Sequence, residues 1–297
     1  MKITEELTKF KKIIDTELEK AIPNRDIMQK KIFEAMRYSI CNGGKRLRPI
    51  LTLKTCEMIS GSYEEALKIA LGIEMIHTYS LIHDDLPAMD NDDFRRGKHT
   101  NHIVFGEDIA ILAGDGLLNY AYETMLDGIP LSKDNYGRHI LAIKEVSRSA
   151  GIFGMIGGQT VDIQLDDNIV EKEKLEFIHR NKTSALIEAS IVSGAIIAGA
   201  NQEQIEYLRA YGQAIGLCFQ IRDDILDKIG DEKLIGKKIG SDEINHKLTY
   251  LSLYGMDNSI NEIQKLNIKA IEWLSIFNEE ESLFFRELAN YLSYRNS

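Results

Sequence analysis

The sequence has few of the residues that interrupt helices. Among its 297 residues there are only four prolines, at positions 23, 49, 87 and 130. Long stretches without proline, rich in Ile, Leu, Glu, Lys and Ala, favour helix. No turn dipeptide separates two runs of alternating apolar and polar residues, so hairpin signals are weak. The sequence therefore predicts an all-α protein.

Basic charge is also scarce. The chain has 36 Lys and Arg residues against 46 Asp and Glu residues, which is a formal net charge of -10. Nucleic-acid binding is disfavoured as the main role, because no basic surplus is left to neutralise a phosphate backbone. A small anionic substrate needs only a local group of cations and stays compatible with this charge.

Cysteines and long apolar runs are few as well. Cys41, Cys56 and Cys218 lack the spacing of a metal site, and we expect reduced thiols in a cytoplasmic protein. The apolar stretch ASIVSGAIIAGA, residues 189–200, is too short to span a bilayer. The first residues, MKITEELTKFKK, contain acids and do not resemble a signal peptide. We therefore expect no transmembrane segment.

Apolar residues recur every three or four positions through most of the chain, as in EEALKIALGIEMIHTYSLI, residues 64–82. This period is typical of helices that are buried over much of their circumference. We find no internal repeat and no low-complexity linker. Residues 1–297 are therefore expected to form one domain, a single large helical bundle. Two pairs match the capping box that begins a helix, Asn201 with Gln204 and Ser259 with Glu262.

What the chain has in abundance is aspartate in two short clusters. The first lies in HDDLPAMDNDD and the second in RDDILD. In the second cluster, residues four apart project from one helix face, where two carboxylates repel each other unless a positive charge lies between them. The members are Asp84, Asp85 and Asp90 in the first cluster, and Asp223, Asp224 and Asp227 in the second.

Pro87 lies inside the first cluster. Asp84 and Asp90 are six residues apart, so a straight helix would place them about 240° apart around its axis. Proline removes a helical hydrogen bond and ends or kinks the helix. We therefore expect the chain to turn near Pro87 and to bring Asp90 back beside Asp84.

Carboxylates in twos and threes are ligands that suit Mg²⁺, which prefers a few carboxylates together with water and substrate phosphates. A solvated acidic loop is the alternative interpretation for any single run of acids. Two similar clusters, each at the end of an apolar helical stretch, favour metal binding.

Cations gather beside glycine turns and beside the acids. In GGKRLRP, two glycines would allow backbone N–H groups to approach an anion. Each cation alone is more often a surface charge, but Arg and Lys grouped near carboxylate-held Mg²⁺ suit a diphosphate. His77 lies two helical turns before Asp84, on nearly the same face. The candidates are Lys45, Arg46, Arg48, Arg95, Arg96, Lys182, Lys237, Lys238 and Lys247.

In their order along the chain, these motifs resemble the trans-isoprenyl diphosphate synthases, also called polyprenyl synthetases. The matching stretches are GGKRLRP, HTYSLIHDDLPAMDNDDFRRGK, ILAGDGLL, GGQTVDI, NKTSAL, FQIRDDILD, and GKKIGSD with KLTY. The resemblance covers most of the chain and is strongest to farnesyl diphosphate synthases of the bacterial type. It implies a helical bundle around a deep central cavity, and a homodimer.

The resemblance also implies roles for the motif residues. Both aspartate clusters are implied to bind Mg²⁺, about three ions per site, together with the allylic diphosphate. The residues implied in catalysis are Asp84, Asp85, Asp90, Arg95, Lys182 and Asp223. The implied pocket for isopentenyl diphosphate consists of Lys45, Arg48, His77 and Arg96. The implied contacts to the allylic diphosphate are Arg95, Lys182, Thr183, Gln220, Lys237 and Lys247.

The implied reaction is a Mg²⁺-dependent, head-to-tail prenyl transfer. The carbon–oxygen bond of dimethylallyl or geranyl diphosphate ionises while charge on the leaving diphosphate is stabilised. The double bond of isopentenyl diphosphate attacks the allylic cation, and a proton is then lost to the departed diphosphate. The expected final product is (2E,6E)-farnesyl diphosphate, and the cavity must exclude water.

Product length is expected to depend on cavity depth. Each added five-carbon unit buries apolar surface worth roughly 4 kcal/mol, at ~0.8 kcal/mol per carbon, so the chain grows until something blocks it. The resemblance implies an aromatic floor at Tyr79, about 7.5 Å before Asp84 along the helix. Helical geometry alone places Ser80 nearer to the face of Asp84, so both residues are candidates for control of chain length.

Two alternatives stay open. A geranylgeranyl diphosphate synthase of the same family is expected to carry a smaller or more flexible residue at the floor. A di-iron carboxylate bundle would use Glu-x-x-His pairs, a spacing found in Glu74 with His77 and in Glu176 with His179. The di-iron alternative leaves both aspartate clusters unexplained.

Overall fold

The computed structural model describes residues 2–130, 135–164, 171–229 and 248–294. Within these ranges nearly all regular structure is helical, which confirms the all-α prediction. The strands in this part of the chain are β1 (Phe94–Arg95) and β2 (Lys98–His99), which pair in a short antiparallel hairpin. No helix in the described ranges combines the length and apolarity needed to cross a bilayer.

The helices follow one another with short connections. The first half of the chain forms α1 (Ile3–Ala21), α2 (Lys30–Ile40), α3 (Leu47–Ser60), the short η1 (Glu64–Ala66), α4 (Leu67–Asp84), α5 (Asn101–Phe105), α6 (Glu107–Asp127) and α7 (Tyr136–Ala150). The second half forms α8 (Met155–Ile163), α9 (Glu171–Ile178), the π-helical η2 (His179–Ser184), α10 (Ala185–Ala198), α11 (Gln202–Ile229), α14 (Tyr250–Trp273) and α15 (Glu279–Tyr294).

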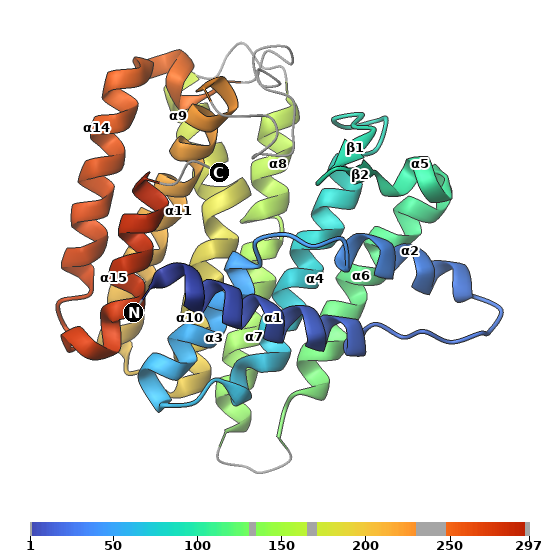
Figure 1. The fold of residues 1–297 in the computed structure, drawn as a ribbon, viewed down its shortest axis with the longest axis horizontal. Helices are drawn as coiled ribbons and strands as arrows, with labels where there is room; N and C mark the ends of the chain where they lie inside the picture. Colours follow the sequence, from blue (N-terminus) through green and yellow to red (C-terminus); the bar gives the residue numbers. More distant parts are fainter. Residues whose placement is uncertain (1, 131–134, 165–170, 230–247, 295–297) are drawn as a thin grey trace.

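Helices α4 and α10 form the centre of the bundle. Residues 69–76 of α4 and 189–195 of α10 are all buried, so both helices are covered around their whole circumference. Helix α10 packs against α3, α7 and α11, while α4 packs against α6 and α3. Figure 1 shows α1 lying across α3 and α4. The apolar stretch 189–200 is therefore core helix, as its length indicated.

The predicted helix starts have different outcomes. The Asn201 box is confirmed, because the Gln204 N–H donates to Asn201 Oδ1 at 2.9 Å and the Asn201 N–H donates to Gln204 Oε1 at 3.0 Å. The Ser259 start is wrong, since Ser259 lies within α14. That helix begins after Thr249 and departs from helical geometry at Gly255, where φ is 76°. Ser259 lies in the first turn after this interruption, which explains its cap-like sequence.

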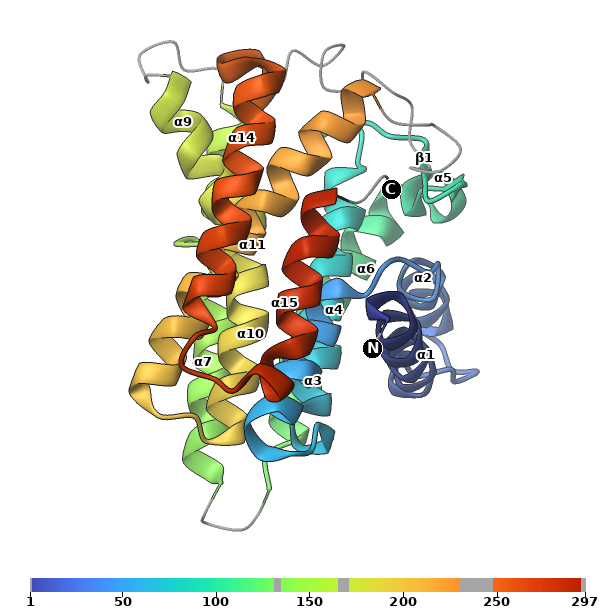
Figure 2. The same cartoon turned by 60° about the vertical axis from the view of Figure 1, so that its left-hand side comes forward.

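Both aspartate clusters lie at one end of the bundle. Asp84 is the last residue of α4, and Asp223, Asp224 and Asp227 lie in the last two turns of α11. Figure 2 shows the C-terminal ends of α4 and α11 on the same side of the molecule. The tertiary fold thus brings together two acidic segments that are more than a hundred residues apart in the sequence.

Close packing of α3 on α10 depends on a glycine. A Cβ on Gly194 would lie 2.4 Å from the carbonyl oxygen of Thr52 and 3.1 Å from the Cβ of Thr55. Alanine in place of a helical glycine ordinarily stabilises a protein by about 0.5–1 kcal/mol. We predict the opposite sign for Gly194→Ala, a loss of about 1–3 kcal/mol, because backbone must move in a packed core.

Chemical denaturation of the purified variants tests this prediction. Gly137→Ala is the matched control, since Gly137 also lies in a helix and a Cβ there would meet no atom within 4 Å. The control should be unchanged or slightly more stable. Equal stability changes in the two variants would contradict the argument.

Candidate active site

The chain turns sharply after α4. The Asp90 N–H donates to the Asp84 carbonyl at 2.8 Å, and the Asp92 N–H donates to the Asp85 carbonyl at 3.2 Å. These bonds close a loop around Pro87 and bring the backbone of Asp90 beside that of Asp84. The expected effect of Pro87 is confirmed, because two carboxylates that a straight helix would separate now face one region.

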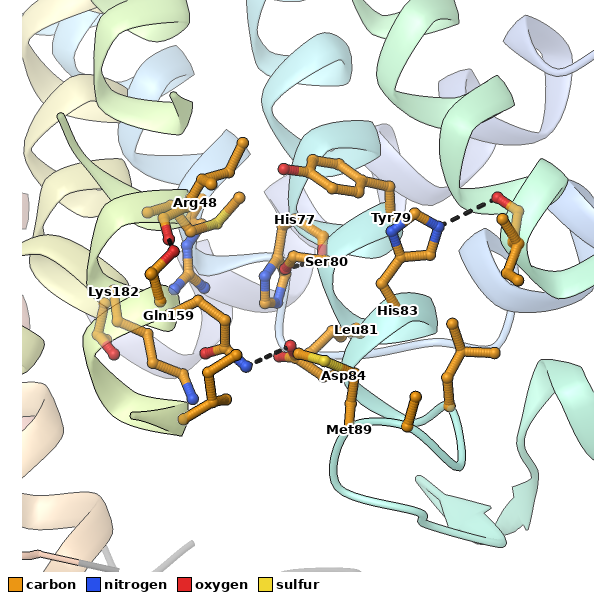
Figure 3. A pocket seen from close by; sticks show the side chains of 18 residues that line it. Arg48, His77, Tyr79, Ser80, Leu81, His83, Asp84, Met89, Gln159 and Lys182 are labelled. Carbon is orange, nitrogen blue, oxygen red and sulfur yellow. Dashed lines mark hydrogen bonds between the residues drawn. The ribbon is translucent and has the colours of Figure 1, made fainter. Parts of the chain in front are cut away.

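A cavity of about 550 Å³ lies below this turn, between α4, α6, α8 and η2. Of the predicted site residues, Asp84, Arg48, His77, Lys182 and Thr183 line it. The predicted chain-length residues Tyr79 and Ser80 line it as well, and the remaining lining is mostly apolar: Leu81, Leu86, Ala88, Met89, Ile111, Met155, Ile156 and Ile163. Figure 3 shows the Tyr79 ring and the Asp84 carboxylate at opposite ends of the labelled α4 residues.

Asp84 is the buried member of the first cluster on the cavity side. Gln159 of α8 donates from Nε2 to Asp84 Oδ1 at 2.9 Å (Figure 3). Burial, with a further contribution from the nearby Asp90 charge, raises the pKa of Asp84 to about 6, although Lys182 opposes this rise. A carboxylate with a raised pKa gains from any cation that binds beside it. Gln159 was not predicted individually, although it lies in the quoted stretch GGQTVDI.

Asp85 points to a different partner. Arg95 of β1 donates to Asp85 Oδ1 from Nε at 2.7 Å and from Nη2 at 2.6 Å. Both side chains are largely buried, and neither is among the residues that line the cavity. In this structure the pair therefore holds the hairpin β1–β2 against the end of α4. Metal binding by Asp85 and substrate contact by Arg95 stay predictions.

The second cluster divides in the same way. Asp223 is exposed and Asp227 is half-buried, while Asp224 is 5% exposed. Gln220 donates from Nε2 to Asp224 Oδ1 at 2.9 Å, and the Tyr250 N–H donates to Asp224 Oδ2 at 2.8 Å. Asp224 thus joins α11 to the start of α14. Asp223 and Asp227 are the members left toward solvent, where an ion could reach them.

The π-helical segment η2 lies between the two clusters. Thr183 donates to Gln220 Oε1 at 2.8 Å, and Lys182 Nζ contacts Asp162 Oδ2 at 2.6 Å. Close approach of α8 is possible because residue 158 is glycine, where a Cβ would lie 2.2 Å from the Lys182 nitrogen. Hydrogen bonds and packing therefore connect Asp84 through α8 and η2 to the acidic end of α11. Single-turn π segments are frequent at functional sites.

The predicted cations beside the cavity form a second group. In the part of the chain that the structure describes, Arg48 Nε is buried and has no hydrogen-bond partner. His77 is kept neutral, since burial and then the charges of Arg48, Arg96 and Arg95 hold its pKa well below the usual range. Lys45 is exposed at the loop before α3. A buried guanidinium with an open donor and a cluster of unneutralised cations suit a diphosphate.

Two predicted contacts, Lys237 and Lys247, lie outside the described residues. Among the residues that are described, no three His, Cys, Asp or Glu side chains are gathered closely enough to hold a metal ion alone. The donor set nevertheless fits Mg²⁺, which binds through one or two carboxylates from each wall together with substrate phosphates. Asp84, Asp90, Asp223 and Asp227 are the residues that would hold it.

The di-iron alternative receives no support. Glu74, one of its predicted ligands, is 2% exposed and accepts a hydrogen bond from Arg46 Nη1 at 2.6 Å. That carboxylate has a structural partner and lies apart from the second Glu-x-x-His pair, which is on α9 and η2.

A helical bundle with acidic clusters at one end of an apolar cavity, and cations beside them, defines an enzyme that transfers apolar groups from diphosphates. The comparisons with known proteins agree: the sequence profile of the family described as polyprenyl synthetase matches residues 29–282. The chain belongs to this family, and it is a prenyltransferase.

Individual relatives cover nearly the whole chain. The large subunit 1 of a heterodimeric chloroplastic geranylgeranyl pyrophosphate synthase from Arabidopsis thaliana is 46% identical over 96% of this chain and 77% of its own length. A geranylgeranyl diphosphate synthase from Cyanophora paradoxa is 43% identical over 97% of this chain and 94% of its own. The crystal structure of an FPP/GFPP synthase from Zymomonas mobilis is 33% identical, with a TM-score of 0.87 over 98% of this chain and 99% of that one.

Removal of one carboxylate from either wall tests the site. We predict that Asp84→Ala and Asp223→Ala each lower kcat by roughly two to three orders of magnitude, because charge on the leaving diphosphate loses its stabilisation. Steady-state assays with Mg²⁺ measure the loss, and circular dichroism checks the fold. Asp26→Ala, in the exposed loop before α2, is the matched control. Full activity in either site variant would refute the role of that wall.

Proposed function

We propose that this protein condenses isopentenyl diphosphate with dimethylallyl or geranyl diphosphate, head to tail and with Mg²⁺, to a product of fifteen or twenty carbons. The observation that carries the proposal is the cavity with Asp84 at its polar end and apolar side chains below. Bound Mg²⁺ would stabilise the charge that develops on the leaving diphosphate.

The chain's own residues explain the rest of the reaction. Lys182 and Thr183 lie where the diphosphate end of an allylic chain would enter the cavity, and Arg48 and His77 line its other side. An allylic cation formed between them is surrounded by apolar walls such as Met89 and Met155, which exclude water. Attack by the isopentenyl double bond then forms the new carbon–carbon bond, and a proton leaves to the departed diphosphate.

The names of the relatives support twenty carbons. Both curated relatives described above are geranylgeranyl diphosphate synthases, and they are 43–46% identical over almost the entire chain. On the comparisons, geranylgeranyl diphosphate is therefore the better supported product, ahead of the farnesyl diphosphate expected from the sequence.

Tyr79 supports fifteen carbons and keeps farnesyl diphosphate as the second candidate. Its side chain is only 6% exposed, and burial raises its pKa to about 12. The ring packs edge-on against His83, with centroids 5.8 Å apart, and His83 contacts the carbonyl of Ile111 on α6 at 3.1 Å. A phenol ring held between α4 and α6 in this way can block a growing chain.

One assay separates these products. The purified protein is incubated with Mg²⁺, isopentenyl diphosphate and dimethylallyl diphosphate, and the dephosphorylated products are resolved by chromatography. A dominant twenty-carbon alcohol would support the geranylgeranyl product, and a dominant fifteen-carbon alcohol the farnesyl product. No prenyl alcohol of any length would refute the proposed function.

Tyr79→Ala is predicted to lengthen the product by at least one five-carbon unit. Removal of the ring opens the cavity, and each further unit gains roughly 4 kcal/mol of burial at ~0.8 kcal/mol per carbon. The same chromatographic assay measures the shift. Tyr122→Ala on α6 is the control, because Tyr122 is near Tyr79 but does not line the cavity. An unchanged product profile for Tyr79→Ala would show that the floor lies elsewhere.

We also propose that the protein is a homodimer and that it is cytoplasmic. Helices α6 and α7 expose large apolar side chains, among them Leu112 and Leu141, each 54% exposed. Apolar surface of this kind supports a buried interface. Sedimentation should give a dimer, and Leu112→Asp with Leu141→Asp should weaken it; a wild-type monomer would contradict this part of the proposal.

A further inference from the structure

Arg46 lies between Lys45 and Arg48 in the GGKRLRP loop but is not among the residues that line the cavity. Its side chain is only 1% exposed. Nε donates to Asp15 Oδ1 on α1 at 2.8 Å, Nη1 donates to Glu74 Oε1 on α4 at 2.6 Å, and Nη2 donates to the carbonyl of Ile40, at the end of α2, at 2.5 Å. One guanidinium therefore binds three different helices, and it belongs to the residue that caps a fourth helix, α3.

The backbone of this loop needs such support. The φ angles of Gly43, Gly44 and Arg46 are 75°, 121° and 52°, all in the left-handed half of conformational space. For Arg46, which has a Cβ, this conformation is unfavourable and persists only where the surroundings hold it. The three hydrogen bonds of its guanidinium provide that restraint.

Arg96 holds the other side of the same loop. Its guanidinium donates to the carbonyl of Gly43, and it covers Gly44 so closely that a Cβ there would lie 2.6 Å from Arg96 Cζ. Arg96 is itself a predicted substrate ligand. Arg46 differs from it because its donors are all directed away from the cavity, to protein acceptors.

Glu74 is the negative charge of this region. Its carboxylate is buried, and it attracts the guanidinium groups of Arg46, Arg48 and Arg96. The cations would otherwise repel one another before a diphosphate binds. Glu74 thus has a partner and a purpose that the Glu-x-x-His spacing did not indicate.

We propose that Arg46, held by Asp15 and Glu74, is a positioning residue that places Lys45 and Arg48 for isopentenyl diphosphate. This inference rests on the proposed function. Arg46 acts only through the loop, so its loss should affect the metal-free diphosphate site and leave the Mg²⁺-dependent allylic site on α4, η2 and α11 largely unchanged.

The experiment compares the wild-type protein with Arg46→Gln, Arg46→Lys, Glu74→Gln and the double variant Arg46→Gln/Glu74→Gln. Calorimetry measures binding of isopentenyl diphosphate without metal, and steady-state kinetics measures KM for isopentenyl and geranyl diphosphate separately. For Arg46→Gln we expect the Kd and KM of isopentenyl diphosphate to rise about tenfold or more, while the KM of geranyl diphosphate changes by less than about threefold. Arg46→Lys should be intermediate, because an ammonium group cannot reach three divergent acceptors.

The double variant separates positioning from stability. Arg46→Gln alone leaves a buried Glu74 carboxylate without its guanidinium, which should lower the melting temperature. Glu74→Gln in the same chain removes that buried charge, so the double variant should regain stability but not affinity for isopentenyl diphosphate. Two residues that act through each other give such non-additive effects. Arg209→Gln, which breaks the ion pairs of Arg209 with Glu145 and Glu188 on α7 and α10, is the matched control and should leave both KM values unchanged.

Each outcome decides one of the two claims. Arg46→Gln with an altered melting temperature and unchanged binding of isopentenyl diphosphate would overturn the positioning role. Equal rises in both KM values would also overturn it, since the effect would not be confined to one site. A wild-type protein that binds isopentenyl diphosphate but shows no turnover would overturn the proposed function, and the calorimetric comparison would still decide the role of Arg46.

Discussion

The repulsion among carboxylates at one end of the bundle is the constraint on which the rest of this structure depends. The turn after α4 brings Asp90 back to Asp84, and burial raises the pKa of Asp84 to about 6. Such a gathering is tolerable because Gln159 donates to Asp84 and Arg95 neutralises Asp85. It also prepares the site, because divalent cations with a diphosphate supply the charge that the protein itself leaves incomplete.

Charge is arranged by function around the cavity. The acids end α4 and α11, where they can hold a diphosphate through metal ions. The cations of the GGKRLRP loop and of the hairpin β1–β2 lie beside His77, which their charges keep neutral. One substrate can thus be recognised through metal and the other directly by guanidinium groups, with Glu74 keeping the second group together. Separate recognition of two diphosphates lets the apolar ends of both substrates meet in one water-free space.

The lower part of the cavity is governed by packing. Tyr79 is fixed by His83, and the His83 ring fits against α6 because residue 114 is glycine, where a Cβ would lie 2.1 Å from His83 Nε2. Product length therefore depends on how two helices pack as well as on one side chain. This helps to explain why relatives with the same motifs carry the names of different products.

The sequence by itself determined the helical class, both acidic clusters and the turn at Pro87, because helical period, carboxylate spacing and proline geometry are local properties. It also brought the cations to attention, and the resemblance indicated the reaction. Only the tertiary structure decided that Asp85 and Asp224 have protein partners, that Gln159 reaches Asp84, and that Arg46 faces inward while its neighbours serve the cavity. These assignments depend on contacts between segments distant in the chain, and in the case of Arg46 on a backbone conformation that an arginine rarely adopts and that no residue pattern indicates.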